Sequence, residues 1–407
     1  MTMVTPTHTP AALAGLRVLE LGAMVAAPYC GKLLASLGAD VVKVEPPKSG
    51  DPSRRRGPFP DDAPHPERSG MFLYLNTGKR GVTLDLDDPQ GREILKQLAA
   101  GADVIIHDSP PALAVARGLE QEALAEINPR LIVAAMTPFG SSGPNAGYAA
   151  HDVNVFHAGG EGNLLPNGLA LDTFPDRAPI AAGGMMASYQ SGLTAAVGVL
   201  GTVIAQWNGG IGQSVDCSMQ EAQIAIGYLP IQRLEAEDFV ETRFSRFFRM
   251  GGVLPAADGY VELLTLEPRQ WEGLARLLGE PEWASVDKFR DPATHGPAIN
   301  ENLQQWTAEH TREWLYREGQ AHGVPIAPYL TPGEVFDSPQ QRERDFFVEV
   351  AHPEEGTHDY AGLPFRMSET PPVLTRAPLL GEHNAEVYGA LGYSPEQLTV
   401  LARAEVI

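Results

Sequence analysis

Residues 16–45 read as a strand, a helix and a second strand, and this order restricts the fold more than any other feature of the sequence. The run LRVLEL at 16–21 predicts a buried strand, and residues 26–37 predict a helix rich in small side chains. The run DVVKVE at 40–45 predicts the second strand. A strand–helix–strand unit of about 30 residues implies a parallel strand pair with a right-handed crossover.

The pattern continues downstream. Residues 81–86, 103–107 and 131–137 predict further strands, and Asp88-Pro89 is typical of a helix start, with Asp88 as the N-cap. A long helix rich in alanine and glycine is expected over 192–207. We therefore predict an α/β fold with a doubly wound parallel sheet.

The 407 residues are too many for one ordinary core, so we expect more than one domain. After residue 225 aromatic and charged residues become more frequent, with helices predicted at 268–278 and 302–321 and a strand in FFVEVAHP at 346–353. The predicted division is a disordered tail (1–11), a large Rossmann-like domain (12–205), a connecting segment (206–224), a smaller α+β domain (225–330) and a C-terminal segment that returns to the large domain (331–407).

Composition excludes several classes of protein. A net charge of −21 argues against a nucleic-acid or anionic-membrane partner. Two cysteines, Cys30 and Cys217, exclude a disulfide framework and a cysteine-based zinc site, and we predict no metal. The loop LGAMVAAP at 21–28 lacks the G-x-G-x-x-G pattern, so NAD and flavin are not expected. The N-terminal ten residues do not resemble a signal peptide, and 195–207 is too short to span a bilayer. We predict a cytoplasmic protein.

Five strings occur in one order: VAAPYCGKLLASLGADVVKVEPPKSGDPSR, LNTGKRGVTLDLDDPQGREIL, ADVII, INPRLIVAAMTPFGSSGP and GIGQSVDCSMQEA. Together they resemble the class III CoA-transferases, the family that includes L-carnitine and bile-acid CoA-transferases, formyl-CoA transferase and α-methylacyl-CoA racemase. The resemblance covers essentially the whole chain. It implies a Rossmann-like large domain, a small domain, and two chains interlocked as a dimer.

The resemblance also implies a reaction between an acyl-CoA and a small carboxylic acid, with CoA as part of the substrate. In this family an aspartate carboxylate attacks the thioester and forms an anhydride, which stays reactive enough for a second exchange. That aspartate stands four residues before a glycine that opens the long helix of small residues. In GGMMASYQSGL the position falls on Ser188, and the nearest upstream aspartate is Asp176. The usual nucleophile is therefore absent, and we interpret Ser188 as a helix-start residue.

The stretch AAHDVNVFHAGGEG at 149–162 supplies other candidate catalytic residues. His151 and Asp152 resemble a His-Asp-x-Asn run of the racemase branch, whose histidine moves the proton next to the thioester carbonyl. The position of Asp152 carries an active-site glutamate in formyl-CoA transferase. LEPRQW resembles a run whose glutamate supports that histidine, which nominates Glu267. A histidine exchanges protons near neutral pH, and a carboxylate partner fixes its tautomer.

Several cations are candidates for binding CoA phosphates in this acidic chain: Lys43, Arg54 within the run Arg54–Arg56, Lys79 and Arg80. The family has an Asn-Phe-Arg-Pro-Gly-like turn near the nucleotide of CoA, and here it reads HDSPPA. That comparison adds Asp108, and Arg117 stands next to the position of a further family arginine.

Three hypotheses follow. The chain transfers CoA between an acyl-CoA and a carboxylic acid, with Asp152 or another carboxylate in place of the missing aspartate. Alternatively, it is a CoA-thioester racemase, epimerase or lyase that uses His151 with Glu267. The third is a catalytically silent subunit that pairs with an aspartate-bearing paralogue. We predict a homodimer for the first two and a heterodimer for the third. The sequence does not name the acyl group.

Overall fold

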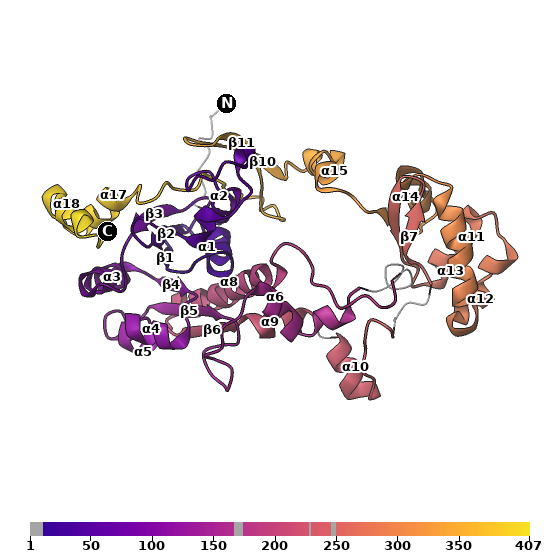
Figure 1. Cartoon of the computed structure of the whole chain (residues 1–407), viewed down its shortest axis with the longest axis horizontal. Helices are drawn as coiled ribbons and strands as arrows, with labels where there is room; N and C mark the ends of the chain where they lie inside the picture. Colours follow the sequence, from indigo (N-terminus) through magenta and orange to yellow (C-terminus); the bar gives the residue numbers. More distant parts are fainter. Residues whose placement is uncertain (1–10, 167–173, 228, 246–249) are drawn as a thin grey trace, which may run out of the picture. The chain divides into compact units, whose positions relative to one another are not determined.

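The computed structural model describes residues 11–166, 174–227, 229–245 and 250–407, which form two compact units (Figure 1). Unit 1 contains the described residues of Met1–Gly160, Ala182–Gly227 and Arg342–Ile407. Unit 2 contains those of Glu161–Ala181 and Tyr228–Gln341. The boundaries predicted from the sequence stay a prediction, and each unit is described by itself.

Unit 1 is built on a six-stranded parallel sheet in the order β3-β2-β1-β4-β5-β6. In chain order the strands are β1 (Arg17–Glu20), β2 (Asp40–Glu45), β3 (Arg80–Thr83), β4 (Val104–His107), β5 (Ile132–Thr137) and β6 (Ser214–Ser218). The strand order reverses between β1 and β4, which is the doubly wound arrangement of a Rossmann-like domain. The predicted α/β fold is confirmed.

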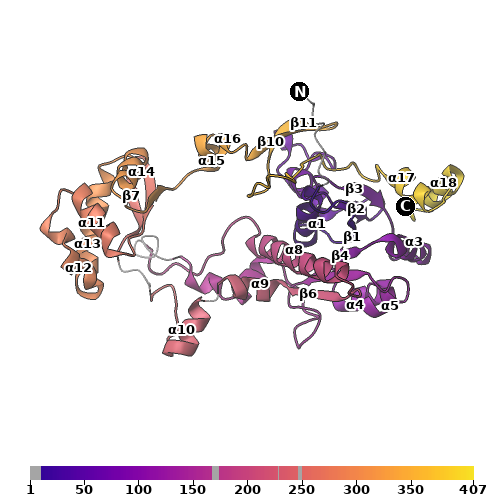
Figure 2. The same cartoon turned by 180° about the vertical axis from the view of Figure 1, so that it is seen from behind.

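Helices cover both faces of this sheet, as Figures 1 and 2 show from opposite sides. Val18 and Ile106 face a core that includes α1 (Ala26–Ser36) and α8 (Met186–Trp207), and Leu19 and Ile105 face the other. The second core is completed by α3 (Pro89–Gly101), α4 (Pro111–Arg117), α5 (Gln121–Ala125), α17 (Asn384–Ala390) and α18 (Pro395–Arg403). Neighbouring strand residues enter opposite cores because strand side chains alternate.

The remaining elements of unit 1 are short. They are η1 (Pro52–Arg55), η2 (Pro60–Asp62), α2 (Gly70–Leu75), α6 (Asp152–Ala158), α9 (Met219–Ile226) and the antiparallel hairpin β10 (Phe347–His352) and β11 (Gly356–Ala361). The predicted cap of α3 is confirmed, because the side chain of Asp88 accepts a hydrogen bond from Gln90 N at 2.7 Å and Pro89 is the first helical residue.

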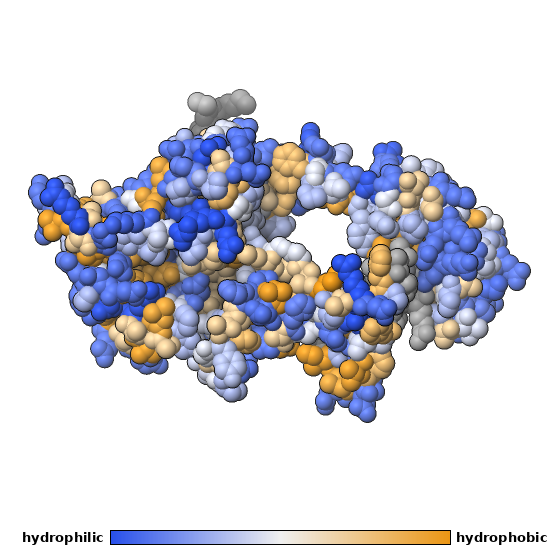
Figure 3. Space-filling view, viewed as in Figure 1, coloured by the Kyte–Doolittle hydropathy of each residue, from blue (hydrophilic) through white to orange (hydrophobic). Residues whose placement is uncertain are grey.

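Unit 2 has its own core. An antiparallel sheet of β7 (Gly252–Ala256), β8 (Gly259–Leu263) and β9 (Ile326–Pro328) packs with Trp271, Leu303 and Leu315. Its helices are η3 (Glu161–Leu164), α10 (Leu229–Glu237), α11 (Pro268–Leu277), η4 (Glu282–Ala284), α12 (Val286–Arg290), α13 (Pro292–Ala308), α14 (Arg312–Ala321) and α15 (Pro332–Phe336), and α16 (Pro339–Glu343) follows. Apolar side chains of α10 lie on the surface, including Leu229, Ile231 and Leu234 (Figure 3).

Three sequence predictions need correction. The single helix expected at 302–321 is two helices, α13 and α14, because Thr311 caps a new helix by accepting from Trp314 N. The long helix begins at Met186 rather than at 192. The sequence did not predict the sixth strand, β6, which pairs with β5. Within the described ranges, no helix has both the length and the apolar character needed to cross a membrane.

Candidate active site

The segment at 151–158 forms the short helix α6. Its predicted proton-transfer residue, His151, is exposed and precedes the helix, and its backbone N–H donates to Asn154 Oδ1 at 2.9 Å. Asp152 is the first helical residue, and Val155 and Phe156 anchor the helix in the protein. Buried apolar residues on one side of α6 thus leave the polar residues of its first turn at the edge of the fold.

Asp152 meets the beginning of α8. Its Oδ1 accepts two hydrogen bonds, from Ser188 N at 2.7 Å and from Ser188 Oγ at 2.8 Å. The residue before α8, Met185, has a positive φ of 57° and no side-chain cap. Asp152 therefore satisfies a backbone donor in the first turn of α8 that the helix cannot satisfy itself. Ser188 is only 8% exposed, and the two hydrogen bonds bring the Asp152 carboxylate to this residue in the first turn of α8.

Glu267 lies in unit 2, whereas His151 lies in unit 1. Glu267 precedes α11, and its carboxylate forms an ion pair with Arg269. Its backbone N–H donates to Gln270 Oε1 at 3.0 Å, so the residue takes part in a reciprocal cap of α11. The predicted support of His151 by Glu267 stays a prediction.

Two of the predicted CoA-binding lysines lie in a buried ion network below the carboxyl ends of the strands. Lys43 Nζ contacts Glu20 Oε1 at 3.0 Å, Asp51 Oδ2 at 2.7 Å and Gly22 O at 2.6 Å. Lys79 Nζ contacts Glu20 Oε2 at 2.6 Å, Asn76 Oδ1 at 2.9 Å and Pro28 O at 2.8 Å. Lys43 thus donates three hydrogen bonds, whereas Lys79 donates two and forms an ion pair with Glu20.

The network shifts the pKa of its members. Burial acts to raise the pKa of Asp51, but the Lys43 ammonium outweighs it and lowers that pKa to about 2. Burial likewise acts to lower the pKa of Lys43, and the carboxylates of Asp51 and Glu20 raise it above its ordinary value. Lys79 keeps a pKa lowered to about 8, because burial outweighs the attraction of Glu20. The charged pairs thus hold the loops after β1 and β2 together.

Arg54 is also buried. Its guanidinium makes two hydrogen bonds to Glu45, at 2.7 and 2.8 Å, and one to Glu67 at 2.6 Å. It also lies over the ring of Phe72, 3.6 Å from the ring centroid. In this structure the fork of Arg54 is occupied by carboxylates of its own chain.

The other predicted cations lie nearer the surface. Arg80 pairs with Asp40 at 2.6 Å and Glu386 at 2.8 Å, and Arg117 pairs with Asp87 at 2.9 Å. A surface ion pair is weak enough to exchange for a phosphate. The proposed contact of these residues with CoA stays a prediction.

Asp108 follows β4 at the same edge of the sheet. Its Oδ2 accepts from Ala23 N at 2.8 Å, which joins the loops after β4 and β1. Burial raises the pKa of Asp108 to about 6, although the hydrogen bond from Ala23 acts in the opposite direction. Asp108 therefore lies at the point where the strand order reverses, where ligands bind in open α/β sheets.

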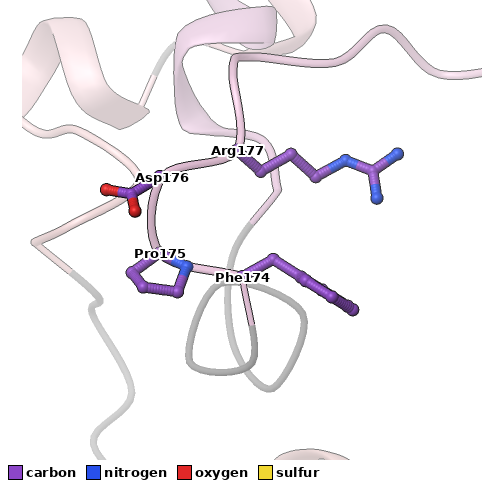
Figure 4. Close-up of a pocket in the computed structure, with 4 residues that line it drawn as sticks. All are labelled: Phe174, Pro175, Asp176 and Arg177. Carbon is purple, nitrogen blue, oxygen red and sulfur yellow. The ribbon is translucent and has the colours of Figure 1, made fainter.

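A pocket of about 450 Å³ lies elsewhere, along the four consecutive residues 174–177 in unit 2 (Figure 4). Phe174 and Arg177 project to one side of this loop, whereas Pro175 and Asp176 project to the other. Ser188 belongs to unit 1. Asp176, the nearest aspartate upstream of Ser188, is thus one of the residues that line this pocket.

Comparison with known proteins shows the family to which the chain belongs. The model of CoA-transferase family III matches residues 13–384. The chain belongs to this family. A formyl-CoA:oxalate CoA-transferase of Streptomyces coelicolor is 30% identical over 98% of this chain and 100% of its own length, and one of Streptomyces avermitilis is 31% identical over 97% and 99%.

Solved structures agree with the assignment. A CAIB/BAIF family protein from Brucella suis is 29% identical, with a TM-score of 0.80 over 94% of this chain and 100% of that chain. Rv3272 from Mycobacterium tuberculosis is 26% identical, with a TM-score of 0.79 over 93% and 99%. The chain is thus a class III CoA-transferase, and enzymes of this family use CoA thioesters as substrates.

The sequence singled out Asp152 and Ser188 separately but did not predict that they touch. Thirty-six positions separate them. The sequence analysis did not identify Lys32, which lies in α1 among small and apolar residues. Lysine is rare in a buried helix, so its position in this run could have marked it as a candidate functional residue.

Proposed function

We propose that this class III CoA-transferase moves CoA from an acyl-CoA to a carboxylic acid and that Asp152 supplies the nucleophilic carboxylate. The observation that supports this role is the pair of hydrogen bonds from Ser188 to Asp152 Oδ1, which holds a carboxylate at the start of α8. Relatives named formyl-CoA:oxalate CoA-transferases support an acid as the acceptor.

The reaction starts when Asp152 Oδ2 attacks the thioester carbonyl and CoA leaves as the thiolate. The product is a mixed anhydride between Asp152 and the acyl group. The thiolate then attacks the aspartyl carbonyl, which releases the first acid as a carboxylate and leaves CoA as a thioester on Asp152. The acceptor carboxylate attacks this thioester and expels the thiolate again. Attack of the thiolate on the acceptor carbonyl gives the new acyl-CoA and restores Asp152.

Ser188 has a defined part in these steps. Oδ1 becomes the carbonyl oxygen of the anhydride and of the enzyme thioester, and it carries negative charge whenever a nucleophile adds to that carbonyl. The Ser188 N–H and O–H already point at Oδ1, so they stabilise this charge without reorganisation. Both hydrogen bonds end on Oδ1, and Oδ2 has no hydrogen-bond partner within the described part of the chain.

Trapping tests the proposal. The enzyme is incubated with formyl-CoA or succinyl-CoA and then treated with hydroxylamine or borohydride, and peptides are analysed by mass. We expect a modified Asp152 in the wild type and none in Asp152→Asn, whose amide oxygen keeps the cap of α8. The matched control is Asp176→Asn, an exposed aspartate in a loop. A wild-type enzyme with no adduct on any aspartate or glutamate would contradict the role of Asp152.

Kinetics separate Asp152 from Ser188 as the nucleophile. Asp152→Asn is expected to lower kcat roughly 10⁴-fold. Ser188→Ala keeps the backbone N–H and loses only the hydroxyl donor, so we expect a loss of about 10- to 100-fold. An equal loss in both variants, with an adduct on Ser188, would assign the nucleophile to the serine. A purified protein that transfers no CoA alone but gains activity with a paralogue would favour the silent-subunit hypothesis.

A further inference from the structure

Lys32 is a buried cation with unused hydrogen-bond donors. It lies on α1 and is 1% exposed. Its Nζ donates to Thr77 Oγ1 at 2.8 Å and lies 4.5 Å from the centroid of the Tyr74 ring. In the described part of the chain it has no carboxylate partner. The ammonium has three protons, and one hydrogen bond leaves two of them without an acceptor.

The contrast with the neighbouring lysines is informative. Lys43 and Lys79 are as deeply buried, and each contacts three oxygen atoms, at least one of them from a carboxylate. A buried ammonium without such partners is costly, and natural proteins seldom keep one without a use. Lys32 therefore lacks acceptors for two of its protons and lacks a neutralising charge, and a bound anion would supply both.

Three tyrosines from three helices are linked to this position, because Tyr74 on α2 lies against Lys32 and Tyr29 stands one turn before it on α1. Tyr29 on α1 and Tyr189 on α8 pack edge to face with ring centroids 4.9 Å apart. Burial, together with the phenols of Tyr29 and Tyr189, raises the pKa of Tyr74 to about 12. None of these hydroxyls makes a hydrogen bond within the described ranges. All three side chains are half-buried, so their hydroxyls can meet a ligand that reaches the surface above Lys32.

The cluster adjoins the proposed nucleophile. Tyr189 follows Ser188 directly in the first turn of α8, and α1 packs against α8 along its length. At Gly192, one turn further on, a Cβ would lie 2.5 Å from Ala26 O and 3.2 Å from Tyr29 Cβ. The close approach brings Tyr29 to the same end of α8 that carries Ser188.

We propose that Lys32, Tyr29, Tyr74 and Tyr189 form an anion subsite that holds the second carboxylate of a dicarboxylic acid while its first carboxylate reacts at Asp152. The inference rests on the proposed function, because it names the class of acid that this site takes. The phenol hydroxyls donate to the carboxylate oxygens, and Lys32 supplies the compensating charge beneath them.

The charge state of Lys32 gives the subsite a measurable signature. Burial and the nearby Lys79 ammonium lower the pKa of Lys32 to about 7. The titratable groups near Lys32 are Lys79, which is itself paired with Glu20, and Tyr74, whose ring lies under Nζ. Tyr29 lies one turn earlier on the same helix, and Tyr189 packs against Tyr29. An anion favours the ammonium form, so binding takes up protons near pH 7.5 and weakens as the pH rises above the pKa of Lys32.

Calorimetry on the full chain tests the subsite with succinate and butyrate, two acids of equal carbon number. We expect succinate to bind about 10-fold more tightly than butyrate. Proton uptake should make the measured binding enthalpy of succinate depend on the ionisation enthalpy of the buffer. Lys32→Gln is expected to lose both the preference and the proton uptake. Tyr189→Phe keeps the ring contact and loses only the hydroxyl, so it should lose part of the preference even if Lys32→Gln does not fold. The matched control is Lys96→Gln, an exposed lysine on α3.

Other results would overturn the proposal. They are equal affinity for succinate and butyrate in the wild type, or an unchanged preference in both Lys32→Gln and Tyr189→Phe. A loss of CoA affinity in Lys32→Gln without a change for succinate would assign the anion to a phosphate of CoA, which also overturns it. Binding needs no chemistry, so the same titration in Asp152→Asn separates the two proposals. Dicarboxylate preference there, with no adduct in the wild type, would retain the subsite and reject Asp152 as the nucleophile.

Discussion

Asp152 illustrates how one residue combines a structural contact with a proposed chemical role. Its carboxylate caps α8 by accepting from Ser188 N, and the same oxygen is held by Ser188 Oγ. The carboxylate reaches α8 from α6, and in the function proposed here this contact holds the nucleophile at the start of α8.

Lys43 has a structural role that makes a direct prediction. Lys43→Met leaves Asp51 buried without its cation and Glu20 with Lys79 alone, and we expect the free energy of unfolding to fall by about 3–5 kcal/mol. Lys96→Met removes an exposed pair with Glu93 and should change it by less than about 1 kcal/mol. Urea unfolding measures both. A loss in Lys43→Met as small as that in Lys96→Met would show that the network does not stabilise the fold.

His107 makes a prediction about pH. It is 3% exposed at the end of β4, and its Nδ1 has no hydrogen-bond partner among the residues that the structure describes. Burial lowers its pKa from 6.5 to about 4. The unfolded chain therefore binds a proton near pH 6.5 that the folded chain does not bind until about pH 4. The free energy of unfolding should fall as the pH drops through this range, by an amount on the order of 1–3 kcal/mol.

The comparison variant for this pH effect is His107→Gln, which cannot titrate. Urea unfolding at pH 7 and pH 5 should show a smaller difference for His107→Gln than for the wild type. His65→Gln replaces an exposed histidine and should keep the wild-type difference. An identical pH dependence in the wild type and His107→Gln would mean that other groups control it.

At the scale of elements, the contact of α1 with α8 depends on a glycine. A Cβ on Gly192 would lie 2.5 Å from the backbone oxygen of Ala26, whereas a Cβ on Gly201 of the same helix would meet no atom within 4 Å. Gly192→Ala should therefore lower the free energy of unfolding by about 1–3 kcal/mol. Gly201→Ala should raise it by roughly 0.5–1 kcal/mol, because alanine favours the helix. Thermal unfolding distinguishes them, and stabilisation by both substitutions would show that α1 and α8 can separate freely.

At the scale of the whole molecule, the two units have separate cores, and a defect in one should first affect that unit. Trp271 is fully buried in unit 2, donates from Nε1 to Ala284 O at 2.7 Å and stacks on Phe289. We expect Trp271→Ala to cost about 3–5 kcal/mol. Hydrogen exchange should then accelerate in peptides from 250–328 and stay unchanged at 17–45.

Trp314→Ala is the control for this experiment. The Trp314 side chain is 38% exposed in the same unit, so its loss should accelerate exchange clearly less than the loss of Trp271. Equal acceleration of the β1–β2 region by Trp271→Ala would show that the two cores unfold together.

The sequence alone determined the class of the fold and the family. Strand and helix periods over 16–45 and the cap at Asp88 are local properties, so they predicted β1, α1, β2 and the start of α3 correctly. Prediction from the local pattern failed in two places. It missed the short interruption between the helices α13 and α14, and it missed the strand β6, whose sequence SVDCS is polar. The interlocked dimer remains a prediction.

Only the tertiary structure decided which charges face one another. The sequence showed Lys43, Arg54 and Lys79 as cations that could bind phosphates, and the fold pairs each with buried carboxylates of its own chain. It also joined Asp152 to Ser188 across 36 positions, placed Lys32 against Tyr74 and packed Tyr29 against Tyr189. Hydrogen bonds and ion pairs act over a few ångströms in space. A sequence fixes only neighbours along the chain, so these contacts exist only once the chain has folded.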